Sequence, residues 1–127
     1  MYAHSKTVRM PFQQAVEAAK DALKDQGFGV LCEIDVQARL KEKTGEDIGP
    51  YVILGACNPA LAARAFAAEP LIGTLLPCNV VVMERDDVVT VATVDALAMM
   101  RMVDNRELEP IANDAAARLR AALDRLA

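Results

Sequence analysis

The dipeptide Cys-Asn occurs twice in this chain, as Cys57-Asn58 and Cys78-Asn79, and each copy lies close to a proline at one end of an apolar, β-prone run. Two thiols next to two amides, on backbone that a proline stiffens, can form a binding or redox site. Small buried side chains at strand ends would give the same pattern. These four residues form the candidate site, and its chemistry stays open among ligand binding, thiol redox chemistry and packing.

The segments around the two dipeptides are expected to bring the thiols together. Both cysteines lie where a strand meets a helix or a loop, and one sheet can place two such strands side by side. Asn58 is a suitable N-cap, and Pro59 a suitable first residue, for an Ala-rich helix that reaches Glu69. Cys57 then precedes a helix N-terminus, where the positive end of the dipole can lower the pKa of a thiol.

A thiophilic ion is one ligand that such a recess could take, because metals such as zinc bind thiolates at about 2.3 Å. Two thiols make an incomplete site, so Met99, Met100, His4 or an exogenous group would have to complete it. Methionines at this spacing more often fill a core or an oligomer contact. The sequence therefore predicts no resident metal or other cofactor, and a small molecule or a thiophilic ion remains the candidate ligand.

Other catalytic arrangements find little support. His4 is the only histidine and Ser5 the only serine, and neighbours on a strand point to opposite faces, which opposes a hydrolase triad. Cys32 alternates in phase with the apolar residues of the segment 28–35 and is expected in the core. No catalytic residue emerges, and a non-catalytic role is favoured.

Composition limits the class of protein. The chain has 127 residues, of which 54% are hydrophobic, which predicts one α+β domain over residues 1–127 that needs no disulfide or metal for stability. A net charge of −4 opposes nucleic-acid binding. No apolar stretch approaches the roughly 20 residues that span a bilayer, and the first residues do not resemble a secretory signal. We therefore expect a cytoplasmic protein with reduced thiols, bound neither to nucleic acid nor to a membrane.

Periodicity predicts the elements that position the candidate site. The expected fold is an antiparallel sheet of about five strands with the first and last long helices packed on one face, plus short connecting helices. The most distinct pairing is a hairpin across the turn 84–87. The expected strands are 2–9, 28–35, 51–54, 80–83 and 88–91, and the expected helices are 11–26, 36–43, 59–69, one apolar turn at 71–76, a turn capped by Asp95, and a last helix from Asn105 or Glu107 to Leu126.

Four phrases of the sequence resemble a known family. They are Gly27-Phe28-Gly29-Val30-Leu31, Glu33-Ile34-Asp35-Val36, Pro50-Tyr51-Val52-Ile53-Leu54-Gly55-Ala56-Cys57-Asn58-Pro59 and Leu76-Pro77-Cys78-Asn79-Val80-Val81-Val82. The chain is similar along nearly all its length to the family called domain of unknown function 302. That resemblance implies a small α+β domain with the topology of a TATA-binding-protein repeat, usually dimeric, and it implies no reaction.

The sequence thus favours a dimeric, non-catalytic module that binds or senses a small ligand at Cys57, Asn58, Cys78 and Asn79. The competing hypotheses are a thiol-dependent redox enzyme that uses the same two cysteines and a structural or protein-interaction domain. A homodimer is also expected because Tyr51–Leu54 and Val80–Met83 carry more apolar side chain than a one-sided sheet in so small a domain can cover.

Overall fold

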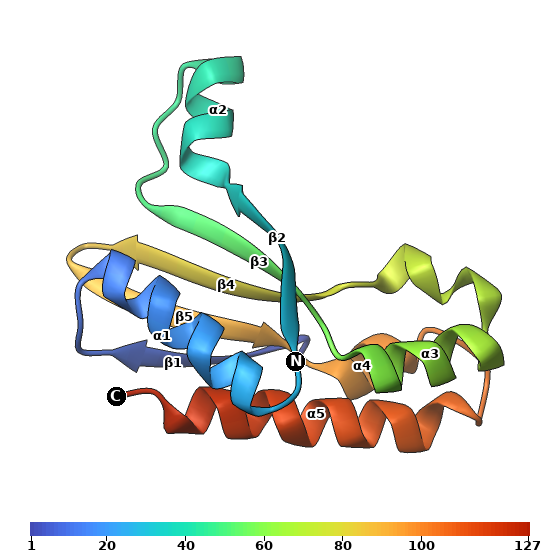
Figure 1. Ribbon diagram of the computed structural model, residues 1–127. Helices are drawn as coiled ribbons and strands as arrows, with labels where there is room; N and C mark the ends of the chain where they lie inside the picture. The colour runs from blue at the N-terminus through green and yellow to red at the C-terminus, as the bar shows by residue number, and fades with distance from the viewer.

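The computed structural model describes all 127 residues. Its five strands form one antiparallel sheet in the order β1-β5-β4-β3-β2. This confirms the predicted fold class (Figure 1). In chain order the elements are β1 (Ala3–Val8), α1 (Phe12–Asp25), β2 (Gly29–Asp35), α2 (Val36–Thr44), β3 (Tyr51–Cys57), α3 (Pro59–Ala68), the 3-10 helix η1 (Pro70–Leu75), β4 (Cys78–Arg85), β5 (Val88–Val94), α4 (Ala96–Met100) and α5 (Leu108–Arg125).

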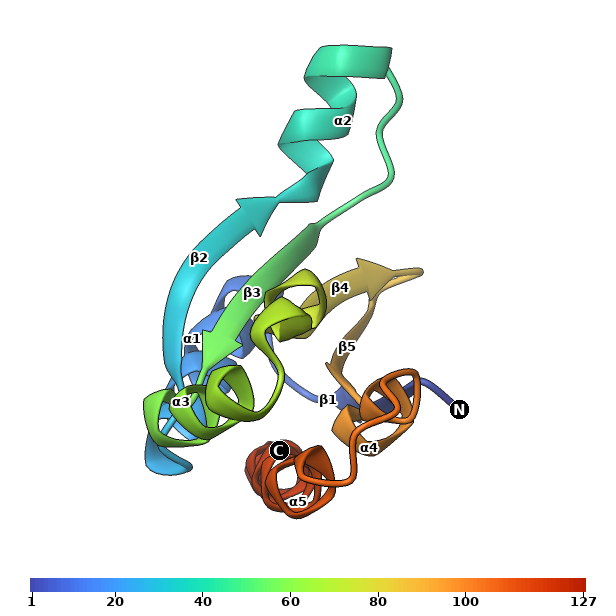
Figure 2. The same cartoon turned by 90° about the vertical axis from the view of Figure 1, so that its right-hand side faces the viewer.

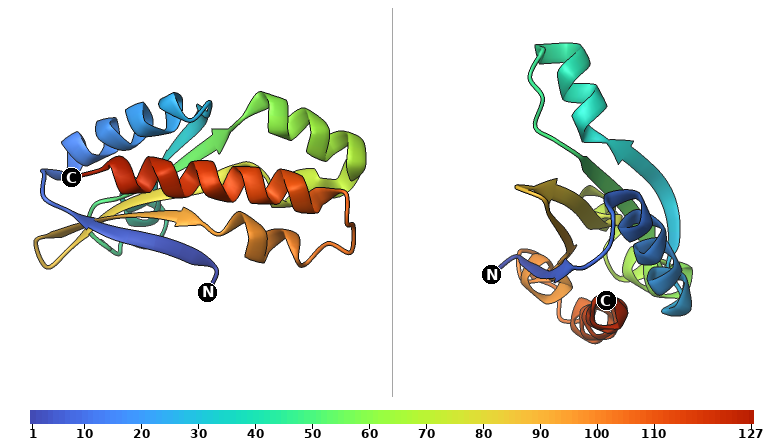
Figure 3. Two further views of the ribbon diagram at one scale, coloured as in Figure 1. Left: turned by 90° about the horizontal axis from the view of Figure 1, so that it is seen from below. Right: turned by 90° about the vertical axis from the view of Figure 1, so that its left-hand side faces the viewer.

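The two long helices, α1 and α5, lie side by side on one face of the sheet (Figure 3). Between them and the sheet lies one hydrophobic core of 26 buried residues. The apolar stripe of α5 is buried from Leu108 to Leu123, and Leu126, just after the helix, is buried as well. The sheet meets it with alternate residues of its central strands, including Leu54, Val80 and Val91. No helix of the molecule is long and apolar enough to cross a membrane.

Local signals in the sequence set most element boundaries. Asp35, Asn58 and Asp95 each cap the helix that follows, because their side-chain oxygens accept hydrogen bonds from backbone amides in its first turn. The β4–β5 hairpin turns at Asp86 and Asp87, whose φ angles are 51° and 63°. Two-residue hairpins favour such left-handed pairs, which Asp tolerates.

One end of β2 and the whole of α2 project from the rest of the molecule (Figures 1 and 2). We call residues 31–50, which run from β2 through α2 back to the start of β3, the arm. Helix α2 has no buried residue, and every residue from Leu31 to Asp35 is exposed. The core is therefore confined to the remainder of the chain, which we call the body.

The arm overturns one prediction. Cys32 was expected in the core and is instead exposed. Alternation in the segment 28–35 correctly indicated a strand, but β2 is an edge strand, and a strand face is buried only where another layer covers it. One expected strand end also differs, because β3 does not stop at Leu54 but continues through Gly55 to Cys57.

Gly55 is required where β2, β3 and the segment before β4 meet. A Cβ atom at this position would lie 2.6 Å from the Cys32 sulfur and 3.0 Å from Cγ of Pro77. Both distances are too short for a side chain without movement of a neighbour. Gly55 therefore serves close packing inside the sheet.

Candidate functional site

A cavity of about 240 Å³ lies at the end of the sheet where β3 gives way to α3. Fifteen of its 18 lining residues are hydrophobic, and none of the 18 carries a charge. Its walls come from the ends of β2, β3 and β4 and from α3, α4 and α5, with η1 closing one side. The lining residues are Phe28, Leu31, Ala56, Cys57, Asn58, Leu61, Ala62, Ala65, Phe66, Gly73, Leu76, Pro77, Cys78, Ala96, Met100, Ile111, Ala112 and Ala115.

The cavity brings together three of the four predicted site residues. Ala56 pairs with Cys78 across β3 and β4, so Cys57 is displaced from Cys78 by one residue along the strand. Both cysteines are free thiols that line this cavity, as expected from the strand ends, and Asn58 lines it with them. Asn79 pairs with Gly55, is exposed and does not line the cavity.

The Cys78 thiol is a weak acid in this setting. Burial raises its pKa to about 11, and the nearby Cys57 contributes in the same direction. Because a thiol ionises only near or above its pKa, Cys78 is neutral at physiological pH. It contributes a polarisable, uncharged surface to the cavity, not a nucleophile.

Asn58 has a structural role that uses both ends of its amide. Its Oδ1 atom accepts a hydrogen bond from the amide of Leu61 at 3.2 Å, and its Nδ2 atom donates to the carbonyl oxygen of Gln26 at 3.4 Å. These contacts cap α3 and attach it to the end of α1. The only amide side chain in the cavity wall is therefore already hydrogen-bonded.

The sulfur atoms in the cavity are those of Cys57, Cys78 and Met100. Met99 does not line it, and no group of three or more His, Cys, Asp or Glu side chains is arranged to hold a metal ion. Of the residues suggested by sequence to complete a thiophilic site, the structure places only Met100 at the same cavity as both thiols.

His4 belongs to a separate cluster. Its Nε2 atom lies 3.2 Å from Oδ2 of Asp95, and Nη1 of Arg120 lies 3.3 Å from its Nδ1 atom. Burial alone would raise the pKa of Asp95, but hydrogen bonds from the Ala98 and Leu97 amides, together with His4, lower it. The cluster joins β1, α4 and α5, and neither it nor Ser5 lines the cavity.

Among the cavity residues that sequence reasoning did not identify, Leu31 and Phe66 are the two large ones that are exposed. Both are large hydrophobic residues that remain exposed, to 69% and 46% respectively. Each also departs from the pattern of its own element. Leu31 lies on the polar side of the expected strand, and Phe66 lies beside the buried positions Leu61 and Ala65 of α3. A large hydrophobic side chain outside the buried pattern of its own strand or helix was the signal in the sequence that could have identified these two residues.

Comparison with known proteins agrees with the fold. A family model described as domain of unknown function DUF302 matches residues 4–126. The chain is also similar to the crystal structure of an uncharacterised conserved DUF302 protein from Bacillus stearothermophilus, with 33% sequence identity and a TM-score of 0.94 over 100% of this chain and 99% of that one. No curated protein matches the chain. Sequence, architecture and the match over nearly all residues lead to one conclusion, that this chain belongs to the DUF302 family.

Proposed function

We propose that this protein is a non-catalytic module that binds a small, uncharged, apolar molecule in the cavity bounded by α3, α4 and α5. The observation that carries the proposal is the cavity wall itself. It is concave, overwhelmingly apolar and free of charged side chains, and an apolar recess with few polar groups is the usual form of a small-molecule site.

The size and polarity of the cavity limit the ligand. An engineered apolar cavity of roughly 150 Å³ accommodates benzene, so about 240 Å³ suits a somewhat larger molecule such as a fused bicyclic aromatic or a short branched chain. A charged group would find no ionic partner in the wall and would lose its hydration, which is unfavourable. The ligand is therefore an uncharged one.

The redox alternative has less support. A thiol-dependent enzyme needs an accessible thiolate, whereas Cys78 is buried and its pKa is raised to about 11.

A thiophilic ion is supported by a different observation, the presence of Cys57, Cys78 and Met100 at one cavity. Such soft sulfur ligands suit Cu(I). Cu(I) titration against a competing chelator tests this second candidate, and Met100→Leu should weaken binding if the thioether is a ligand.

We also propose that the functional form is a homodimer, in which a second copy covers the surface that the helices leave bare. The face of the sheet opposite α1 and α5 carries half-buried Ile53, Val81 and Met83 on adjacent strands. The arm adds Ile34, which is exposed and pairs with Ile53 across β2 and β3. A continuous apolar face of this kind is typical of an interface.

The arm supplies the reason to choose a second copy as the partner. A helix as short as α2, with nine residues and no buried side chain, is marginal in water without packing. Its three basic residues, Arg39, Lys41 and Lys43, outnumber the single acidic Glu42, whereas the chain as a whole is acidic. Sedimentation should show a dimer at micromolar protein. A concentration-independent monomer would remove the proposal.

Ligand binding can be tested with the neutral fluorescent probe 1-naphthylamine, a fused bicyclic aromatic, and with two neighbouring alanines. Ala62 lines the cavity, whereas Ala63 on the same helix is exposed and does not. Ala62→Phe should fill the cavity and abolish saturable probe binding, while Ala63→Phe should leave it unchanged. Wild-type protein that shows no saturable binding would contradict the proposal.

A further inference from the structure

The mouth of the cavity is formed by two exposed apolar side chains from different parts of the chain. Leu31 comes from the edge strand β2 and Phe66 from α3, and both line the cavity. We infer that Leu31 contacts the ligand and closes over it opposite Phe66, an inference that rests on the proposed function. Binding of the ligand thereby immobilises the base of the arm.

The backbone of β2 is built to place Leu31 at the cavity. Val30 pairs with Ala56 and Cys32 pairs with Gly55, so the residue between them has no partner and forms a β-bulge. A bulge inserts one residue and redirects a side chain, which is why bulges recur beside binding sites. In a regular strand Leu31 would be one of the paired residues. Here it is the extra residue and reaches the cavity wall.

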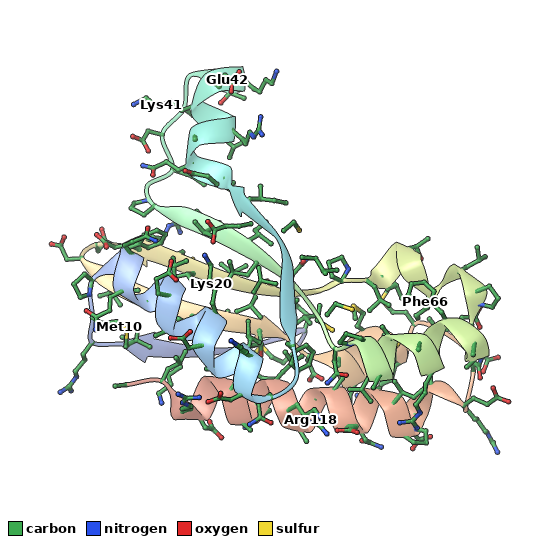
Figure 4. All side chains as sticks on the ribbon, viewed as in Figure 1. Met10, Lys20, Lys41, Glu42, Phe66 and Arg118 are labelled. Atoms are coloured by element: carbon green, nitrogen blue, oxygen red, sulfur yellow. The ribbon has the colours of Figure 1, made fainter.

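Phe66 lines the cavity from α3 and lies between that helix and η1 (Figure 4). A Cβ atom at Gly73 would lie 3.3 Å from Cε1 of the Phe66 ring, so the ring lies directly over a residue without a side chain. Glycine at this place allows η1 to approach the ring closely. Phe66 nevertheless remains 46% exposed.

An apolar molecule in the cavity would bury surface that is now exposed on both residues. Leu31 is 69% exposed, so contact with a ligand removes more apolar area from water there than at any fully buried wall position. The same contact would link β2 to α3 through the ligand. Because β2 leads directly into α2, occupancy of the cavity is coupled to the mobility of the arm base.

The test compares two residues of the same strand. Leu31 lines the cavity, whereas Ile34 is similarly apolar, is 42% exposed and does not line it. In titrations with 1-naphthylamine, Leu31→Ala should weaken binding by about tenfold, the size expected for lost apolar contacts in a pocket. Ile34→Ala should change it by less than about twofold, and Leu31→Met should restore most of the affinity.

Hydrogen exchange provides the second readout. Saturating probe should slow exchange of the amides of residues 30–33 in the wild type and fail to do so in Leu31→Ala. Probe binding that is unchanged in Leu31→Ala, or exchange that is unaltered by probe in the wild type, would overturn this inference and leave the proposed function intact. Absence of any probe binding by the wild type would overturn both.

Discussion

Helices α1 and α2 differ in what covers them, although each is followed by a glycine with a positive φ angle, 83° at Gly27 and 79° at Gly45. Helix α1 buries five residues against the sheet and α5, whereas α2 buries none. A glycine that ends a helix is a local signal, and it acts in both α1 and α2. Burial depends on neighbours brought from elsewhere in the chain, and only the body has them. The comparison separates helix formation, which is local, from helix stability, which is not.

The largest difference between body and arm is expected in the free energy of unfolding when one leucine in each region is replaced by alanine. Leu54→Ala should lower the free energy of unfolding by about 3 kcal/mol, the usual cost of a buried leucine, because Leu54 is completely buried between the sheet and the helices. Leu40→Ala on α2, where the side chain is 37% exposed, should lower it by less than about 1 kcal/mol at low protein concentration. Urea unfolding measures both.

The variant Leu40→Ala also tests the arm at high protein concentration, where the proposed dimer forms. If a second copy covers the arm, Leu40→Ala should raise the dimer dissociation constant without changing probe binding. Equal losses of stability for Leu54→Ala and Leu40→Ala in dilute protein would show that the arm is packed against the same chain, contrary to the structure.

The next largest effect is expected where arm and body join. Gly55→Ala should lower the free energy of unfolding by about 1 to 3 kcal/mol, as over-packing usually does, because the added methyl group meets the Cys32 sulfur at 2.6 Å. Gly29→Ala is the matched control, since no atom lies within 4 Å of a Cβ there. Cys32→Ala should relieve part of the loss, and a double-mutant cycle in thermal unfolding checks that coupling.

Removal of a helix N-cap should affect stability differently in the body and in the arm. Asn58→Ala removes the cap of α3 and should lower the free energy of unfolding by about 1 kcal/mol. Asp35→Ala removes the equivalent hydrogen bond to Ala38 in the arm. Because α2 carries no core contacts, it should fray locally and leave the global midpoint almost unchanged. Amide exchange resolved by residue distinguishes local fraying from global unfolding.

The smallest effect is the pH dependence of the His4 cluster. The pKa of Asp95 lies below its ordinary value of 3.8 in the folded protein, so the unfolded chain binds its proton first as pH falls. Asp95 therefore contributes stability that is complete well above pH 3.8 and is lost as the pH drops through the folded pKa. Asp95→Asn should flatten this acid part of the stability profile. A profile that keeps its slope would assign the acid sensitivity to other carboxylates.

Much of the fold follows from the sequence alone because its signals are short-range. Pro59, Asp95 and the Asp86-Asp87 turn act on backbone within a few residues of themselves, so their positions locate helices and a hairpin directly. The stripe of α5 needs only a period of 3.6 residues to be recognised. The two Cys-Asn dipeptides likewise indicated one place in the fold, since both adjoin strand ends.

Tertiary structure decided the rest. Nothing local distinguishes an apolar strand face that is covered from one that is bare, so Cys32 was expected in the core and lies exposed on the edge strand. The cavity depends on residues from seven elements that meet only after folding. Asn79 is exposed and does not line it, although Asn79, like Asn58, directly follows a cysteine. Chain alternation fixes which way a side chain points relative to its neighbours, whereas the layers packed around it determine what that side chain meets.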